Sequence, residues 1–365
     1  MKVSRKIAVG ILVMISAAIA ISLAELTVAI LKPQPVYRTL LANFPAMHIK
    51  GDVLPHVLKP GYHGRFKREE FDTSININSR GFRGTEFLDG GEPRLVIMGD
   101  SFTFGHGVED SEAYPAILNS MFKKVEIINA GFVAGSSPDM YLAWLRAHGT
   151  ELHASSIVIG FFIGNDIDRH NQMIWTAVDS DGLPISIDNS ESVVVNHYLQ
   201  PRITPIGYRY PLLRESHLFH LAGSAFRNLE IMFKPPAIRP SIFDETYWPE
   251  TQQAVNITKR LFVAMNEWAI RHHIRFAVIM IPTLQQVNKT APDKPQKDFA
   301  AFFSANGIHY LDLLPTMTAY SEPLYYPADQ HWNVRGHKVA AKIIGDWLCE
   351  TSFIECDISE RQLFL

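Results

Sequence analysis

Short apolar runs, each followed by a segment with helical spacing, constrain the fold of this chain more than any other feature. The clearest run is 156–162, which reads as a strand buried on both faces. The other predicted strands are 94–98, 125–129, 275–281 and 309–311. The predicted helices are 112–122, 140–148, 251–272, 297–305 and 335–348. Because alternating strands and helices form parallel sheets, we predict an α/β protein: a three-layer α/β/α sandwich around a parallel, doubly wound sheet.

The same pattern divides the chain into parts. Residues 33–92 contain a proline-rich linker and a lead-in with a small β element at 74–78. The main domain is predicted at 93–350, and a C-terminal tail follows at 351–365. Residues 168–248 interrupt the alternation, and we expect them to be an insertion that forms a lid or cap over one end of the sheet.

The N-terminus carries a targeting signal. Lys2, Arg5 and Lys6 precede Ile7–Ala24, eighteen residues without a charge. We expect residues 1–32 to be a cytoplasmic tail and a transmembrane signal-anchor, because about 20 apolar residues span a bilayer. A cleaved secretory signal is the alternative, since small residues stand near position 24. Both place the body of the protein outside the cytoplasm. A third interpretation, a buried helix of a soluble domain, agrees less well with a basic segment followed by an unbroken apolar run.

Composition excludes several classes of protein. Of 365 residues, 47% are hydrophobic and 19% are charged, so the chain is globular and not disordered. With 34 basic and 37 acidic residues, it shows no excess positive charge that would indicate a nucleic-acid partner. Two cysteines, Cys349 and Cys356, are too few for a four-thiolate zinc site. They could form a short disulfide in an oxidising compartment or remain as two buried thiols. Composition does not indicate an oligomeric state.

Polar residues with catalytic potential stand where predicted strands end. Ser101 follows the first strand, Gly135 lies in the loop after the second, and Asn165 follows the third. An Asp-x-His pair, Asp329 and His331, precedes the last helix. Ligands of doubly wound sheets bind outside the carboxyl ends of the strands, so these loops are the expected site.

These four blocks, in this order, resemble the Ser, Gly, Asn and His blocks of the SGNH (GDSL-like) hydrolase superfamily. The resemblance covers about residues 70–348. It includes the lead-in 78–84 and the residues 281–283 after the fourth strand. It implies the SGNH version of the flavodoxin-like fold. The second block is one residue longer than the common pattern, so Gly131 or Ala134 is an alternative to Gly135. The last block is one residue shorter, and we expect an extended segment to bring Asp329 and His331 to the same side.

Acyl transfer requires a nucleophile, a base, a group that orients the base, and donors for the oxyanion. We expect Ser101 to be the nucleophile, His331 the base and Asp329 the residue that orients it. The backbone N–H groups of Ser101 and Gly135 and the side-chain amide of Asn165 would bind the oxyanion. The chain contains no Gly-x-Ser-x-Gly, which argues against an α/β-hydrolase nucleophile elbow.

The sequence therefore predicts an extracytoplasmic serine esterase that acts on an O-acyl ester, with acetyl on a carbohydrate or cell-envelope polymer as the expected substrate. The alternatives are an O-acyltransferase with the same residues and a non-catalytic glycan-binding or assembly protein. No metal or organic cofactor is expected. His217 and His220 could share a helical face and bind a metal, but we interpret them as surface or lid histidines. His106 could contact the substrate or fill a loop.

Overall fold

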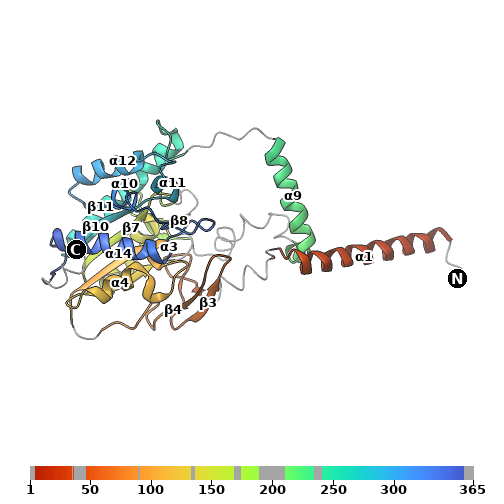
Figure 1. The fold of residues 1–365 in the computed structure, drawn as a ribbon, viewed down its shortest axis with the longest axis horizontal. Helices are drawn as coiled ribbons and strands as arrows, with labels where there is room; N and C mark the ends of the chain where they lie inside the picture. Colours follow the sequence, from red (N-terminus) through yellow and green to blue (C-terminus); the bar gives the residue numbers. More distant parts are fainter. Residues whose placement is uncertain are drawn as a thin grey trace. The chain divides into compact units, whose positions relative to one another are not determined.

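The structure is a computed structural model that describes residues 5–34, 36, 47–88, 91–132, 136–167, 174–188, 210–233 and 241–356. The chain forms two compact units. The larger unit comprises 46–194 and 240–365, and the smaller unit comprises 1–45 and 195–239. Figure 1 shows the helices and strands in sequence colours.

A parallel five-stranded sheet, with strand order β11-β10-β7-β5-β6, is the centre of the larger unit. Its strands are β5 (Arg94–Gly99), β6 (Glu126–Gly131), β7 (Ala154–Phe162), β10 (Arg275–Ile281) and β11 (His309–Asp312). The first two strands of this sheet in chain order, β5 and β6, are neighbours, and β7 pairs with the other side of β5. The order therefore reverses at β5, which confirms the predicted doubly wound sheet and marks its carboxyl edge as the expected ligand site.

Helices cover both faces of this sheet. Successive residues of β5 therefore point into two different hydrophobic cores, one on each face. Leu95 packs in one core with α4 (Tyr114–Met121) and α14 (Val334–Glu350). Val96 packs in the other core, formed with α5 (Pro138–His148), α10 (Pro249–Arg271) and α12 (Lys294–Ala305). Short helices complete the unit: η1 (Asp110–Glu112), η2 (Gly149–Leu152), α11 (Leu284–Val287) and α13 (Leu314–Met317).

The residues before the sheet form two small antiparallel pairs. In the stretch expected to be a linker, β1 (His48–Ile49) pairs with β2 (Val57–Leu58). The predicted β element is a hairpin of β3 (His63–Lys67) and β4 (Asp72–Asn76). Part of the lead-in is therefore folded into the larger unit.

The region 168–248 is divided between the two units. Strands β8 (Trp175–Val178) and β9 (Pro184–Ile187) form a hairpin in the larger unit. The Trp175 indole N–H donates to Asp139 of α5 at 2.8 Å, which fastens this hairpin to the helix. Helices α8 (Pro211–Arg214) and α9 (His217–Phe233) belong to the smaller unit. That the region forms a lid stays a prediction.

Helix α1 (Arg5–Leu31) also belongs to the smaller unit and contains no buried residue. Among the described helices, it is the one that is long and apolar enough to cross a membrane.

Helix α3 (Ser101–Phe104) lies directly against the carboxyl ends of three strands. A Cβ at Gly99 of β5 or at Gly160 of β7 would overlap the Thr103 hydroxyl of α3. A Cβ at Gly131 of β6 would overlap the backbone of Phe104. These glycines let α3 approach the sheet, which gives Gly131 a packing role whatever its part in the second block.

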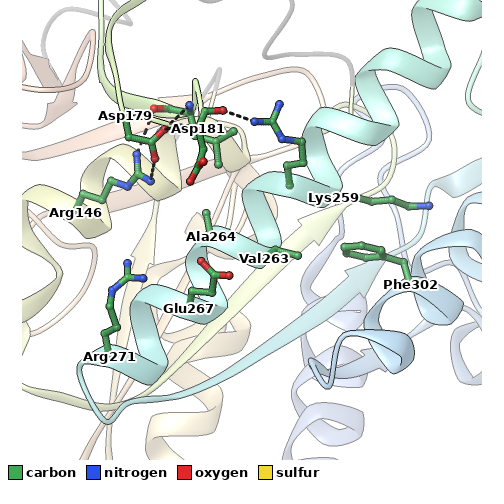
Figure 2. A pocket seen from close by; sticks show the side chains of 11 residues that line it. Arg146, Asp179, Asp181, Lys259, Val263, Ala264, Glu267, Arg271 and Phe302 are labelled. Atoms are coloured by element: carbon green, nitrogen blue, oxygen red, sulfur yellow. Dashed lines mark hydrogen bonds and ion pairs between the residues drawn. The ribbon is translucent and has the colours of Figure 1, made fainter.

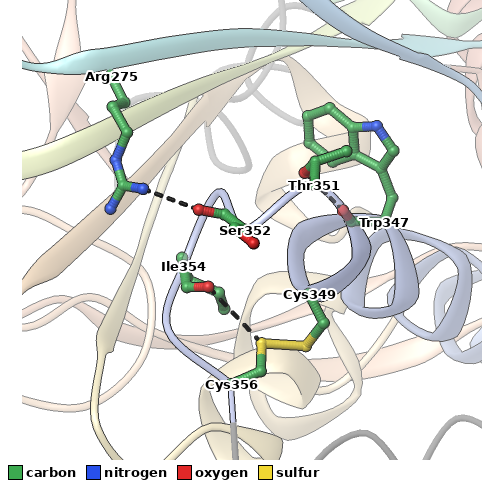
Figure 3. The surroundings of a disulfide bond; sticks show 7 residues. All are labelled: Arg275, Trp347, Cys349, Thr351, Ser352, Ile354 and Cys356. Carbon is green, nitrogen blue, oxygen red and sulfur yellow. Dashed lines mark hydrogen bonds between the residues drawn. A yellow bond between two sulfur atoms is a disulfide. The ribbon is translucent and has the colours of Figure 1, made fainter.

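A disulfide joins Cys349, in the last turn of α14, to Cys356, with 5.6 Å between the two Cα atoms (Figure 3). This is the first of the two states that the sequence left open. The closed loop is short, so the cross-link stabilises the fold by about 2–3 kcal/mol, mainly by restricting the unfolded chain.

Candidate active site

Ser101 stands at the point where the strand order reverses. It is the first residue of α3 and follows β5 after a single residue, Asp100. The Asp100 side chain caps this helix, because its Oδ1 accepts the N–H of Phe102 at 2.9 Å. As the first residue of a helix, Ser101 has an N–H without a partner inside that helix.

Ser101, His331 and Asp329 form a chain of two short hydrogen bonds. The distance from Ser101 Oγ to His331 Nε2 is 2.7 Å, and that from His331 Nδ1 to Asp329 Oδ1 is 2.6 Å. Because an ionised carboxylate only accepts, Nδ1 carries the ring proton and Nε2 can accept from the serine hydroxyl. The side chain of His331 is 24% exposed, so these hydrogen-bonded side chains are open to solvent.

The contact between Asp329 and His331 arises from a turn, so the extended segment that we expected is wrong. The residue between them, Gln330, has φ of 66°, in the left-handed region. Its N–H donates to Tyr326 O at 2.9 Å, and Tyr326 N–H donates to His331 O at 2.8 Å. These two bonds close a tight loop that points both side chains to the same place.

Two further residues hold Asp329. His106 Nε2 lies 3.4 Å from Asp329 Oδ2, on the oxygen that His331 does not use. Glu70 accepts the backbone N–H of Asp329 at 2.6 Å. Burial alone would raise the pKa of the Asp329 carboxyl, but the hydrogen bonds from His106 and His331 hold that pKa well below its usual value. Asp329 is therefore a carboxylate at any pH near neutral.

The ring of His106 is enclosed by other rings. Its centroid lies 4.2 Å from that of His331, 5.0 Å from Phe66 and 5.1 Å from Phe71. Burial and the neighbouring charge of His331 lower the pKa of His106 to about 4, although Asp329 opposes the shift. His106 is therefore neutral near pH 7 and binds Asp329 as an uncharged donor. The sequence presented it as a loop or substrate residue, and its place beside Asp329 depends on the fold.

Arg83, from the lead-in 78–84, holds the loop that follows α3. Its guanidinium is buried, pairs with Asp110 at 2.6 Å, and donates to the carbonyls of Phe104 at 2.9 Å and Val108 at 2.7 Å. The sequence pattern included this stretch in the family resemblance but predicted no structural role for Arg83. The structure shows that one buried cation binds carbonyls at the end of α3 and in the loop that follows it.

The predicted oxyanion residues are only partly described. Asn165 lies in the turn after β7, the strand beside β5, so it follows the sheet at the same edge as Ser101. The next residue, Asp166, closes this turn by accepting Phe162 N–H at 3.0 Å. Gly135 and its alternative Ala134 lie outside the described residues.

Metal binding has one candidate group among the described residues. Ligand atoms of His106, Asp329 and His331 lie within 4.8 Å of one another, but the hydrogen bonds above already use Asp329 and His331. The other pair considered, His217 and His220, has backbone partners instead. His217 Nδ1 accepts Gln34 N–H at 2.8 Å, and His220 Nε2 lies 3.1 Å from Arg214 O.

A cleft in the larger unit is lined by none of Ser101, Asp329 and His331. This cleft, of about 370 Å³, lies between α5, α10 and the loop joining β8 to β9. Figure 2 shows its charged lining, in which Arg146 pairs with Asp179 at 2.5 Å and Lys259 lies close to Phe302. Both acidic and basic side chains line this cleft, so the lining favours neither an anionic nor a cationic ligand.

The burial of His106 makes stability depend on pH. Its pKa falls from 6.5 to about 4 in the folded state, so between these values the unfolded chain takes up a proton that the folded chain does not. Unfolding therefore becomes easier as the pH falls through this window, by at most about 3 kcal/mol from this group. The variant His106→Phe keeps a ring and removes the titration. Urea unfolding should show a smaller loss of stability for the variant over this window, and equal losses would contradict the assignment.

One family model matches part of this chain. Residues 271–361 match the family model described as "ALGX: SGNH hydrolase-like domain, acetyltransferase AlgX". No curated protein matches the chain.

Three solved structures are similar. The lipase/acylhydrolase from Enterococcus faecalis is 13% identical, with 70% of this chain and 95% of that one covered and a TM-score of 0.38. A GDSL-like lipase from Bacteroides thetaiotaomicron is 14% identical, with 73% of this chain and 93% of that one covered and a TM-score of 0.36. A two-domain esterase active on acetylated mannans is 12% identical, with 73% of this chain and 51% of that one covered and a TM-score of 0.38.

The matched family segment includes Asp329 and His331, and the structure joins them to Ser101 at the carboxyl edge of a doubly wound sheet. This segment of the chain is similar to the SGNH hydrolase-like domain that the family model describes.

Proposed function

We propose that this chain is an extracytoplasmic serine esterase that hydrolyses O-acyl esters, acetyl above all, on a carbohydrate or cell-envelope polymer. The observation that carries the proposal is the hydrogen-bonded chain from Ser101 through His331 to Asp329. This arrangement supplies a nucleophile, its base and the group that orients the base.

In the first half of the reaction, His331 Nε2 takes the hydroxyl proton of Ser101 while Oγ attacks the acyl carbonyl. A bond forms between Oγ and the acyl carbon, and the bond to the sugar oxygen breaks. His331 returns the proton to that oxygen, so the sugar leaves as an alcohol. In the second half, His331 takes a proton from water, the hydroxide attacks the acyl-serine, and Ser101 regains its proton as the carboxylic acid leaves.

The oxyanion formed in each half needs donors. The Ser101 N–H is one, because it has no partner within α3, and the side-chain amide of Asn165 is proposed as another, since it follows the neighbouring strand. Gly135 is proposed as the third donor from the sequence pattern. Asp329 stabilises the imidazolium and, with a strongly lowered pKa, remains ionised throughout.

The location rests on two observations. Helix α1 is apolar over a length that spans a bilayer, and basic residues precede its apolar run. The disulfide between Cys349 and Cys356 is typical of oxidising compartments outside the cytoplasm. Together they support a single-pass membrane anchor with the larger unit outside.

A second candidate function is O-acyl transfer to a sugar hydroxyl. The matching family model carries the description acetyltransferase, which favours it. Both functions pass through the same acyl-serine, and they differ in whether water or a sugar hydroxyl reaches it.

Substitutions test the roles of the site residues by their order of effect. Ser101→Ala should abolish nearly all ester turnover, and His331→Ala should cost about as much, because residues that act as a unit are not additive. Asp329→Ala should be milder, since the imidazole still works when it is oriented less often. Asn165→Ala should lower kcat by about 10²–10³ with little change in KM. The measurement is p-nitrophenyl acetate hydrolysis by protein shown to be folded by circular dichroism. Full activity of Ser101→Ala would reject the mechanism, and a change in KM alone for Asn165→Ala would reject its oxyanion role.

Product analysis separates the two candidate functions. The full chain is incubated with an acetylated glycan, with and without an unacetylated acceptor sugar, and free acetate and acetylated acceptor are quantified by mass spectrometry. A hydrolase releases acetate at the same rate in both cases. A transferase acetylates the acceptor, and acetate release falls when acceptor is present. Ser101→Ala is the control, and products that persist in this variant would contradict both functions.

A further inference from the structure

An exposed apolar stripe runs along helix α9 in the smaller unit. Ala222, Ala225, Phe226 and Leu229 follow one another at helical spacing on one face, and all four are exposed. Phe226 is 70% exposed and Leu229 is 48% exposed. The opposite face is more covered, since His220 is buried. A large aromatic and a leucine facing outward on an amphipathic helix indicate a partner for this face.

The first turn of α9 is fastened to α1. The carboxylate of Glu25, in α1, accepts the Ser216 hydroxyl at 2.6 Å and the N–H groups of His217 and Leu218 at 2.6 Å and 3.0 Å. A carboxylate in this position satisfies N–H groups that the helix cannot pair and complements the positive end of its dipole. The N–H of Gln34, just after α1, also bonds His217 Nδ1. The start of α9 is therefore held from two sides at the C-terminal end of α1.

Taking Ile7–Ala24 as the membrane-spanning part of α1 places Glu25 at a membrane surface. The uncharged run Ile7–Ala24 has a length of about 27 Å at 1.5 Å per residue, close to the thickness of the hydrocarbon core. A spanning α1 thus carries Glu25 at the outer boundary, where a carboxylate costs far less than at the centre of the bilayer. In Figure 1, α9 leaves this end of α1 and runs across the axis of α1.

We infer that α9 is an interfacial helix that lies on the outer surface of the membrane crossed by α1, with the stripe of Ala222, Ala225, Phe226 and Leu229 in contact with lipid. The inference rests on the proposed membrane anchor. The partner is a phospholipid bilayer, because the helix is fastened to the apolar helix α1 at Glu25 and carries an exposed apolar face. Two residues just before α9, Tyr210 and Leu212, are 55% and 88% exposed, and tyrosine is common at membrane interfaces.

Lipid contact is measured by site-directed fluorescence quenching on the full chain in vesicles. Phe226→Cys and Leu229→Cys place a single thiol on the stripe, since both native cysteines are in the disulfide. Each thiol is labelled with an environment-sensitive fluorophore, and lipids with a nitroxide on the upper acyl chain act as quencher. Ser224→Cys, on the opposite face of α9, is the matched control. Leu23→Cys, in α1, reports the anchor, and Lys297→Cys, on an exposed surface of the larger unit, reports water.

Because an interfacial helix buries its apolar face about 5–10 Å into the headgroup and acyl boundary, fluorescence at positions 226 and 229 should fall about twofold. Position 23 should also be quenched, and positions 224 and 297 should not. If position 23 alone is quenched, the anchor stands and the inference about α9 is wrong. A blue shift at 226 and 229 without lipid quenching would mean that protein covers the stripe, either a second copy or the larger unit, and would equally overturn the inference. If position 23 is not quenched, the anchor itself fails and the inference falls with it.

Discussion

Helix α3 packs closely against the ends of three strands, because Gly99, Gly131 and Gly160 lack the Cβ that would overlap Thr103 or Phe104 of the helix. This close approach fixes Ser101 at the crevice where the strand order reverses. Arg83 then ties down the loop beyond the helix by binding its carbonyls. The proposed nucleophile is thus positioned by the close packing of α3 on the sheet, and the loop that carries His331 needs only to reach it.

That loop is built to hold one ionised carboxylate. Asp329 receives hydrogen bonds from His331 and from a neutral His106, while Glu70 accepts its backbone N–H. With both carboxylate oxygens occupied, the orientation of Asp329 is restricted from two sides, and the proton on His331 is kept at Nδ1. The lone pair of Nε2 therefore faces Ser101, which is the protonation state that proton transfer from the serine requires.

Much of this could be predicted from the sequence, because local pattern decides it. The five strands of the sheet are predicted from short runs of sequence, Ser101 and Asn165 stand just after strands, and the Asp-x-His pair stands before the last helix. The rest depends on contacts between distant segments. His106 and Glu70 reach Asp329 across more than 200 residues of sequence, and no local spacing reveals such a meeting. The left-handed turn at Gln330 was also hidden, since its residue type does not demand that conformation. The attachment of α9 to Glu25 likewise joins residues that lie 192 positions apart in the sequence, Glu25 and His217.

The central claim is that Ser101 is an activated nucleophile. Labelling the folded, full chain with a fluorophosphonate probe and mapping the modified peptide by mass spectrometry tests it most directly. The account predicts a single adduct on Ser101, formed in the native protein and absent when the protein is unfolded in urea before the probe is added, because the activation depends on the bond to His331. A folded protein that takes up no probe, or an adduct on any other residue, would contradict it.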